Sequence, residues 1–109
     1  MTNEYIEYIK EVLSPYGLVK SRAMFGGHGI YLDNMIVGLI AFGELYFKGD
    51  KETEAFYSKF DTHPFTYEGK AGKPVSMQYW KVPAEVFDSE DLMDQWVATA
   101  YQASVRAKK

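Results

Sequence analysis

The glycine-rich run from Gly26 to Gly29 is the part of the chain that most looks like a ligand-binding loop. Such loops bind phosphate when a helix begins directly after them, because its first backbone N–H groups point at the anion. Here Ile30 to Phe42 follows, and its residues predict strands. We therefore expect a bulge or bend in an antiparallel sheet, where glycine permits positive φ or a close approach of two backbones.

The two histidines are the other residues that could carry metal or acid–base chemistry. His28 lies inside the glycine run, whereas His63 precedes a proline in a different segment, and the chain has no cysteine. A zinc or iron site needs three or four ligands that converge. We therefore predict no metal and no cofactor.

Nucleophilic catalysis finds no support in the serines or the carboxylates. No serine stands in a G-x-S-x-G elbow, and Ser89 is placed to cap a helix. The acidic residues between Glu85 and Asp94 surround that helix start, where the helix dipole stabilises them. We predict no catalytic residues and no enzyme; the remote alternative is a small enzyme with a site around His28 and Arg22.

Basic residues form a candidate contact surface for nucleic acid or an acidic protein partner. Lys20 and Arg22 alternate along a predicted strand and so share one face. Lys48 ends another strand, while Lys70 and Lys73 lie in a glycine-rich loop. The net charge of −3 and the pI near 5.3 oppose binding of nucleic acid by bulk electrostatics. Direct nucleic-acid binding is therefore the alternative function, and solubility with protection of strand edges is the ordinary role of these lysines.

Length and composition predict one globular domain over residues 1–109. The chain is 47% hydrophobic and 25% charged, which is typical of a folded protein. Its start carries acidic residues where a signal peptide would be basic and then apolar. The longest apolar-dominated stretch, Met35 to Phe42, is far shorter than a membrane span. We expect a cytoplasmic protein.

Hydrophobic periodicity predicts an α+β fold, with an antiparallel meander of about four strands, two more strands and three helices. No helix-length segment separates the first four strands, which excludes parallel βαβ units. The expected helices are Thr2 or Asn3 to Leu13, Asp50–Phe60 and Ser89–Arg106. The expected strands are Val19–Phe25, Gly29–Leu32, Met35–Phe42, Leu45–Lys48, Phe65–Glu68 and Val75–Val82, with Asp33-Asn34 as a hairpin turn.

The third expected strand is apolar on both faces. Strict alternation places Met35, Val37, Leu39 and Ala41 on one face, and Ile36, Ile40 and Phe42 on the other. Either the helices divide between the two faces of the sheet, or a second subunit covers one of them. We expect self-association, because an uncovered face of this size would itself be an interaction site.

Four stretches resemble, in order, the N-terminal domain of the TfoX/Sxy family of bacterial regulators. They are Arg22–Asp33, Leu45–Lys48, Pro64–Lys70 and Val75–Pro83, and the resemblance extends from Arg22 to about the last helix. Within them, the residues that mark the family are Met24, Phe25, Gly26, Gly27, Gly29, Tyr46, Tyr67, Gly69 and Pro83. Two positions depart from the pattern: Gln78 falls where proline is common, and His28 where an aromatic residue is frequent.

The resemblance implies a fold like that of type III secretion chaperones, in which dimers are common. It also implies a regulatory role in natural competence, because full-length members act as transcriptional coactivators with the cyclic-AMP receptor protein. It brings no catalytic residues and no cofactors. Full-length members carry a further C-terminal domain, which this chain is expected to lack. The function expected from the resemblance is a non-enzymatic domain that binds a protein partner, with the transcription machinery as the candidate partner.

Overall fold

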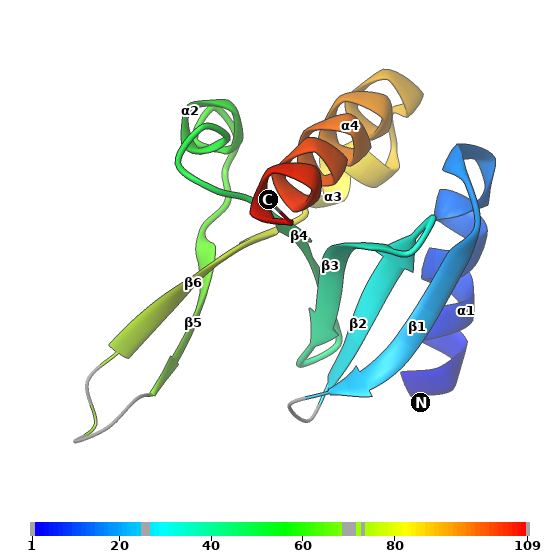
Figure 1. Cartoon of the computed structure of the whole chain (residues 1–109), viewed down its shortest axis with the longest axis horizontal. Helices are drawn as coiled ribbons and strands as arrows, with labels where there is room; N and C mark the ends of the chain where they lie inside the picture. The colour runs from blue at the N-terminus through cyan, green and yellow to red at the C-terminus, as the bar shows by residue number, and fades with distance from the viewer. Residues whose placement is uncertain (1, 25–26, 69–71, 73, 109) are drawn as a thin grey trace.

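A computed structural model describes residues 2–24, 27–68, 72 and 74–108, and within them six strands form one antiparallel sheet (Figure 1). The helices are α1 (Thr2–Leu13), α2 (Glu54–Tyr57), α3 (Ala84–Phe87) and α4 (Glu90–Ala107), with a 3₁₀ turn, η1 (Ser14–Tyr16), after α1. The strands are β1 (Val19–Met24), β2 (Gly27–Leu32), β3 (Met35–Ala41), β4 (Glu44–Lys48), β5 (Pro64–Glu68) and β6 (Pro74–Lys81).

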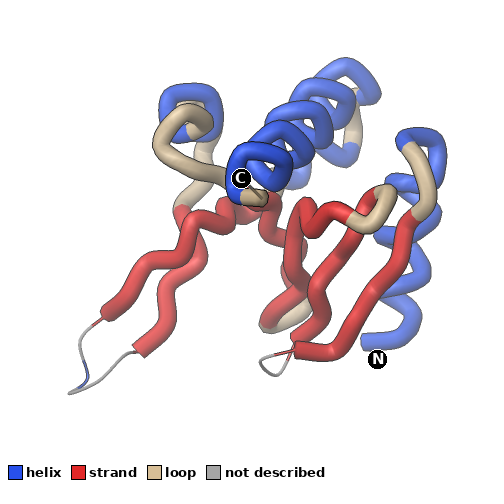
Figure 2. The backbone as a smooth tube through the Cα atoms, in the orientation of Figure 1, coloured by secondary structure: helices blue, strands red, loops and turns tan. Residues whose placement is uncertain are grey.

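The strand order in the sheet is β1-β2-β3-β4-β6-β5. The first four strands form the predicted meander, and the β5–β6 hairpin joins it through β6. The described pairing between β4 and β6 covers only Tyr46–Lys48 and Tyr79–Lys81. Beyond that pairing the hairpin projects away from the turn between β3 and β4 (Figures 1 and 2). The α+β class and the antiparallel sheet are confirmed.

Two of the turns in the meander lie within the described residues, and both are tight. Asp33 and Asn34 have φ of 50° and 69°, the pattern of a type I′ hairpin turn, as predicted. Phe42 and Gly43 repeat this pattern with φ of 55° and 74°. Strand β3 therefore ends at Ala41, and the prediction that it runs through Phe42 is wrong because the chain already turns there.

A bulge in β3 changes which residues face the helices. Ile30 pairs with Gly38 and Tyr31 pairs with Ile36, so Val37 is an extra residue opposite β2. Val37 and Ile40 consequently face the helices. The predicted grouping of Val37 with Leu39 is wrong, because the extra residue interrupts the alternation.

The main core lies on one face of the sheet and surrounds the side chain of Trp96, which is fully buried. Its ring lies 4.7 Å from that of Tyr57 in α2 and 5.1 Å from that of Phe60. All four helices contribute buried residues to this cluster: Ile6, Ile9 and Leu13 from α1, Tyr57 from α2, Val86 from α3, and Met93, Trp96, Val97 and Ala100 from α4. The helices therefore do not divide between the two faces of the sheet.

The second helix is shorter than the predicted Asp50–Phe60. The prediction that Asp50 caps this helix is wrong, because Thr53 occupies the N-cap position of α2 and its side chain makes no cap hydrogen bond. The Oδ1 of Asp50 instead accepts hydrogen bonds from the backbone N–H groups of Glu52 and Thr53, at 3.0 and 3.1 Å, in the turn that precedes the helix. After α2, Lys59 and Phe60 donate their N–H groups to carbonyl oxygens three residues earlier. These tighter turns end the α-helix at Tyr57.

Helix α4 is held at both ends. The Oγ of Ser89 accepts a hydrogen bond from the backbone N–H of Leu92 at 3.2 Å, which confirms the predicted cap. At the other end Arg106 donates to both carboxylate oxygens of Asp50, at 2.7 and 3.1 Å. This hydrogen-bonded pair lowers the pKa of Asp50.

None of the described helices is both long and apolar enough to span a membrane.

Replacing Gly27 should destabilise the fold because a Cβ atom there would lie 2.1 Å from the carbonyl oxygen of Ile40. This spacing confirms the close backbone approach predicted for the glycine run. We expect Gly27→Ala to lower the free energy of unfolding by about 1–3 kcal/mol, the usual effect of overpacking. Chemical denaturation measures it.

The matched control is Gly43→Asn. Gly43 also lies at positive φ, but a Cβ atom there meets nothing within 4 Å, and asparagine tolerates this backbone conformation. The control should change the free energy of unfolding by less than about 0.5 kcal/mol. Equal losses from the two substitutions would contradict the close approach at Gly27.

Stability at high pH should depend on Tyr16, whose hydroxyl donates to Asp94 Oδ1 at 2.5 Å and ties η1 to α4. Burial of the phenol and this hydrogen bond raise the pKa of Tyr16 from 10.0 to about 12. Because the native pKa is raised, the stabilisation is complete below pH 10 and is lost as the pH rises to about 12.

The test compares the wild type with Tyr16→Phe, which cannot ionise, by denaturant unfolding at a series of pH values. The wild type should lose its stability advantage over the variant across that window. A difference that stays constant with pH would refute the coupling.

Candidate functional site

The face of the sheet that points away from the helices is here called the open face. Residues directly opposite each other in an antiparallel pair point to the same face, so the strand register identifies its members. One row across the sheet is Arg22, Gly29, Leu39, Tyr46 and Lys81; a second is Lys20, Tyr31 and Ile36; Lys48 lies opposite Tyr79.

The open face has a small apolar cluster of its own. Leu39, Tyr46 and Tyr79 are only 7–8% exposed, with Ala41 and Phe65 packed beside them. The rings of Tyr46 and Phe65 meet edge to face at 5.1 Å. Every member of this cluster comes from a strand, so the strands bury these side chains without help from a described helix.

Phe42 stands at the end of this cluster and is 87% exposed. Its ring stacks on that of Phe65 with the centroids 6.0 Å apart and an angle of 22° between the planes. Its φ of 55° belongs to a turn type that favours asparagine, aspartate or glycine. A left-handed conformation costs a side chain such as phenylalanine roughly 1–2 kcal/mol. Folding alone therefore gives no reason for a large exposed ring at this position.

Within the described residues, four cations lie on the open face. Lys20 and Arg22 on β1 are exposed. On β4, Lys48 lies over the ring of Tyr79, with its Nζ 5.1 Å from the centroid, and burial lowers its pKa. On β6, Lys81 forms an ion pair with Glu44 at 3.2 Å. Glu44 is the one carboxylate among the described strand side chains on this face, which is therefore positive on a chain of net charge −3.

The predicted basic residues are brought together only in part. Lys20, Arg22 and Lys48 do share the open face, but β2 and β3 separate β1 from β4, a backbone distance of about 14 Å at the usual strand spacing. Lys70 and Lys73 lie outside the described residues. The sequence-based prediction did not include Lys81. It lies two residues after Tyr79 on the same strand, and that spacing could have placed both side chains on one face of the sheet.

The family-marker residues divide between structural roles and the open face. Gly27 allows the close approach to Ile40, Gly29 lies between Arg22 and Leu39 in the central row, and Tyr46 is part of the apolar cluster. Pro83 occupies the position just before α3, Met24 ends β1 and Tyr67 lies within β5. Phe25, Gly26 and Gly69 lie outside the described residues.

The geometry contradicts a catalytic site built on His28 and Arg22. His28 lies opposite Ala23 and Ile40, and Ile40 belongs to the core beneath the helices. Arg22 points to the other face of the sheet, so the two side chains cannot converge. His63 is exposed, with its Nδ1 3.2 Å from the carbonyl oxygen of Pro64. Within the described part of the chain, no three His, Cys, Asp or Glu side chains are grouped to hold a metal ion.

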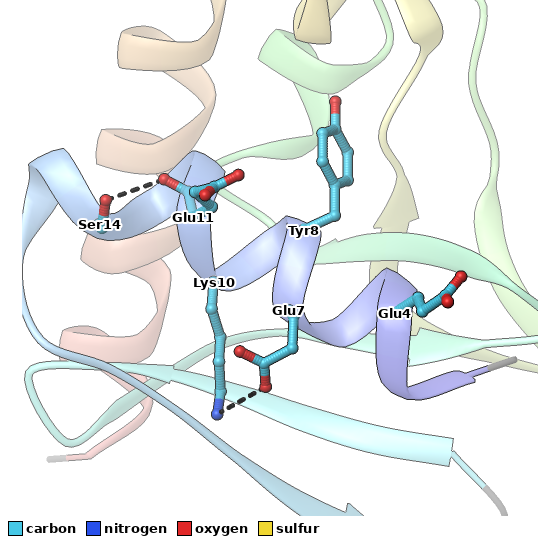
Figure 3. A pocket seen from close by; sticks show the side chains of 6 residues that line it. All are labelled: Glu4, Glu7, Tyr8, Lys10, Glu11 and Ser14. Carbon is cyan, nitrogen blue, oxygen red and sulfur yellow. Dashed lines mark hydrogen bonds and ion pairs between the residues drawn. The ribbon is translucent and has the colours of Figure 1, made fainter.

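A wide, open hollow of about 710 Å³ lies against the outer side of α1, lined by Glu4, Glu7, Tyr8, Lys10, Glu11 and Ser14. Figure 3 shows its side chains leaving the helix in different directions. Glu7 pairs with Lys10 at 3.6 Å, and Ser14 donates to the carbonyl oxygen of Glu11. These contacts are those of a solvated helix surface, so the hollow holds no catalytic arrangement.

Two comparisons with known proteins bear on this architecture. The family model of the TfoX N-terminal domain matches residues 11–104. The protein Sxy of Escherichia coli strain K12 is 24% identical over 81 residues, a segment that covers 74% of this chain and 38% of Sxy. The chain thus matches little more than a third of the length of that relative.

Proposed function

Because the chain belongs to the TfoX N-terminal domain family, we propose that it is a regulatory domain that acts by binding a protein partner in the cytoplasm. Membership in this family confirms the resemblance to it that the four sequence stretches indicated. The role that this resemblance implies is transcriptional regulation, with the partner drawn from the transcription machinery. The domain itself performs no catalysis.

The observation that carries this proposal is the open face. It combines a packed aromatic cluster with Phe42, a ring that is 87% exposed. Protein interfaces are enriched in aromatic residues and arginine, and a few such residues supply most of the binding energy. The charged side chains of Lys20 and Arg22 lie to one side of the apolar centre, as polar residues do at an interface rim.

Direct nucleic-acid binding is the second candidate, and one observation favours it. Lys20, Arg22 and Lys48 share a face with aromatic rings, as in proteins that bind single strands. It ranks second because Lys81 is already paired with Glu44, and Lys48 is half-buried against Tyr79.

The proposal is tested by photo-crosslinking in the native cell. A benzoylphenylalanine replaces Phe42 in one version of the chain and Tyr8 in another. Tyr8 is the matched control, because it is an aromatic residue 46% exposed on α1, on the helical side of the molecule. The version labelled at position 42 should capture a transcription protein, identified by mass spectrometry, and the version labelled at position 8 should not.

Three results would count against the proposal. Capture of the same partner from position 8 alone would move the interface to the helices. Capture of nucleic acid would favour the second candidate. Capture of only a second copy of the chain would make the open face a homodimer interface.

A further inference from the structure

We propose that the open face binds an extended acidic segment of the partner protein, with an apolar side chain of that segment packed on Phe42. This inference rests on the proposed function and adds the chemistry of the partner. It follows from the charge of the face, the spacing of its cations and the unusual position of Phe42.

The charge of the open face selects an acidic ligand. Among the described cations of this face, Lys20 and Arg22 are exposed and unpaired by Glu44, the one described strand carboxylate there, which pairs with Lys81. The helical side is acidic: Glu4, Glu7 and Glu11 lie along α1, and Glu90 and Asp91 lie in the first turn of α4. Complementary charge guides the encounter and excludes partners of like charge. A partner segment that carries carboxylates is therefore directed to the open face.

The spacing of the cations suggests how the segment lies. Arg22 and Lys81 stand at the two ends of the central row, with Leu39 and Tyr46 between them. Lys48 and Arg22 belong to strands about 14 Å apart, a distance that about four residues of extended chain cover. Two acidic residues about four positions apart, with an apolar residue between them, would match both the cations and the apolar cluster.

Phe42 supplies an anchor for a further apolar residue of the segment, because it lies beyond the Ala41–Glu44 pair, on the other side of the central row from Lys48. Its ring is exposed, yet it is held in place by stacking on Phe65, which itself packs against Tyr46. A ring already held in position loses little conformational freedom when a partner binds. A phenylalanine at positive φ, in a turn that favours asparagine, is the kind of local strain found at functional sites.

Two other occupants fit the face less well. A single-stranded nucleic acid needs cations along a whole row of phosphates, but on this face Lys20 and Arg22 are the only exposed cations among the described residues, and the chain has a net charge of −3. A second copy joined symmetrically through this face would place the cations of both copies in one interface, where like charges repel. An acidic peptide avoids both conflicts.

The test is selection from a random peptide library displayed on phage, with the whole chain as bait. Enriched peptides should carry paired acidic residues that flank an aromatic residue or leucine. Their affinities are then measured by fluorescence anisotropy for the wild type, Phe42→Asn, Arg22→Glu and the control Tyr8→Asn. The first two variants should weaken binding about 30-fold or more, as loss of a hot-spot residue does, and the control should not.

The Phe42→Asn variant separates binding from folding. Asparagine suits the positive φ of the turn, so the variant should melt no lower than the wild type while it loses the peptide. Arg22 is exposed, so Arg22→Glu keeps the fold and tests the charge independently.

Each contrary outcome has a distinct meaning. Enrichment of neutral or basic peptides that still need Phe42 would overturn the acidic chemistry and leave the proposed docking function standing. The inference would be overturned if the enriched peptides bound Phe42→Asn and Arg22→Glu as tightly as the wild type. It would also be overturned if no peptide were enriched. A fluorescein-labelled oligothymidylate that binds more tightly than the best peptide would also overturn it, in favour of nucleic acid.

Discussion

Packing of every described helix on one face of the sheet, around Trp96, is the constraint on which the rest of the structure depends. A six-stranded sheet with apolar residues on both faces then has one face that the helices cannot bury. On that face the side chains of Leu39, Tyr46 and Tyr79, which come from three strands, pack against one another. That solution leaves the exposed ring of Phe42 at the edge of the cluster and produces a surface with the composition of an interface.

Local sequence signals predicted most of the fold. Asp33-Asn34 forms the expected turn, and Ser89 caps the last helix. These features depend on residues within one turn of each other, so a single sequence suffices to find them. The bulge at Val37 depends on pairing with Ile30 in a neighbouring strand, which periodicity cannot reveal. The short second helix likewise reflects tertiary packing of Phe56 and Phe60 on Trp96.

The candidate site was only partly predictable, because its definition depends on which face of the sheet the helices occupy. Alternation placed Lys20 and Arg22 together correctly, since both lie on one strand. Lys81 and Phe42 joined them only through the order of the strands and the turn that ends β3. The predicted strand Met35–Phe42 included Phe42, so the prediction gave no sign that its ring is exposed. The exposed ring and the positive face emerge from long-range contacts rather than from any single motif.

Binding of a partner to the open face is tested most directly by hydroxyl-radical footprinting of the chain, first alone and then in complex with its captured partner. Phe42 should be strongly reactive in the free chain, because its ring is exposed, and should become protected in the complex. Tyr8, on the opposite side, should react equally in both samples. Unchanged reactivity of Phe42, together with protection of Tyr8, would contradict binding through the open face.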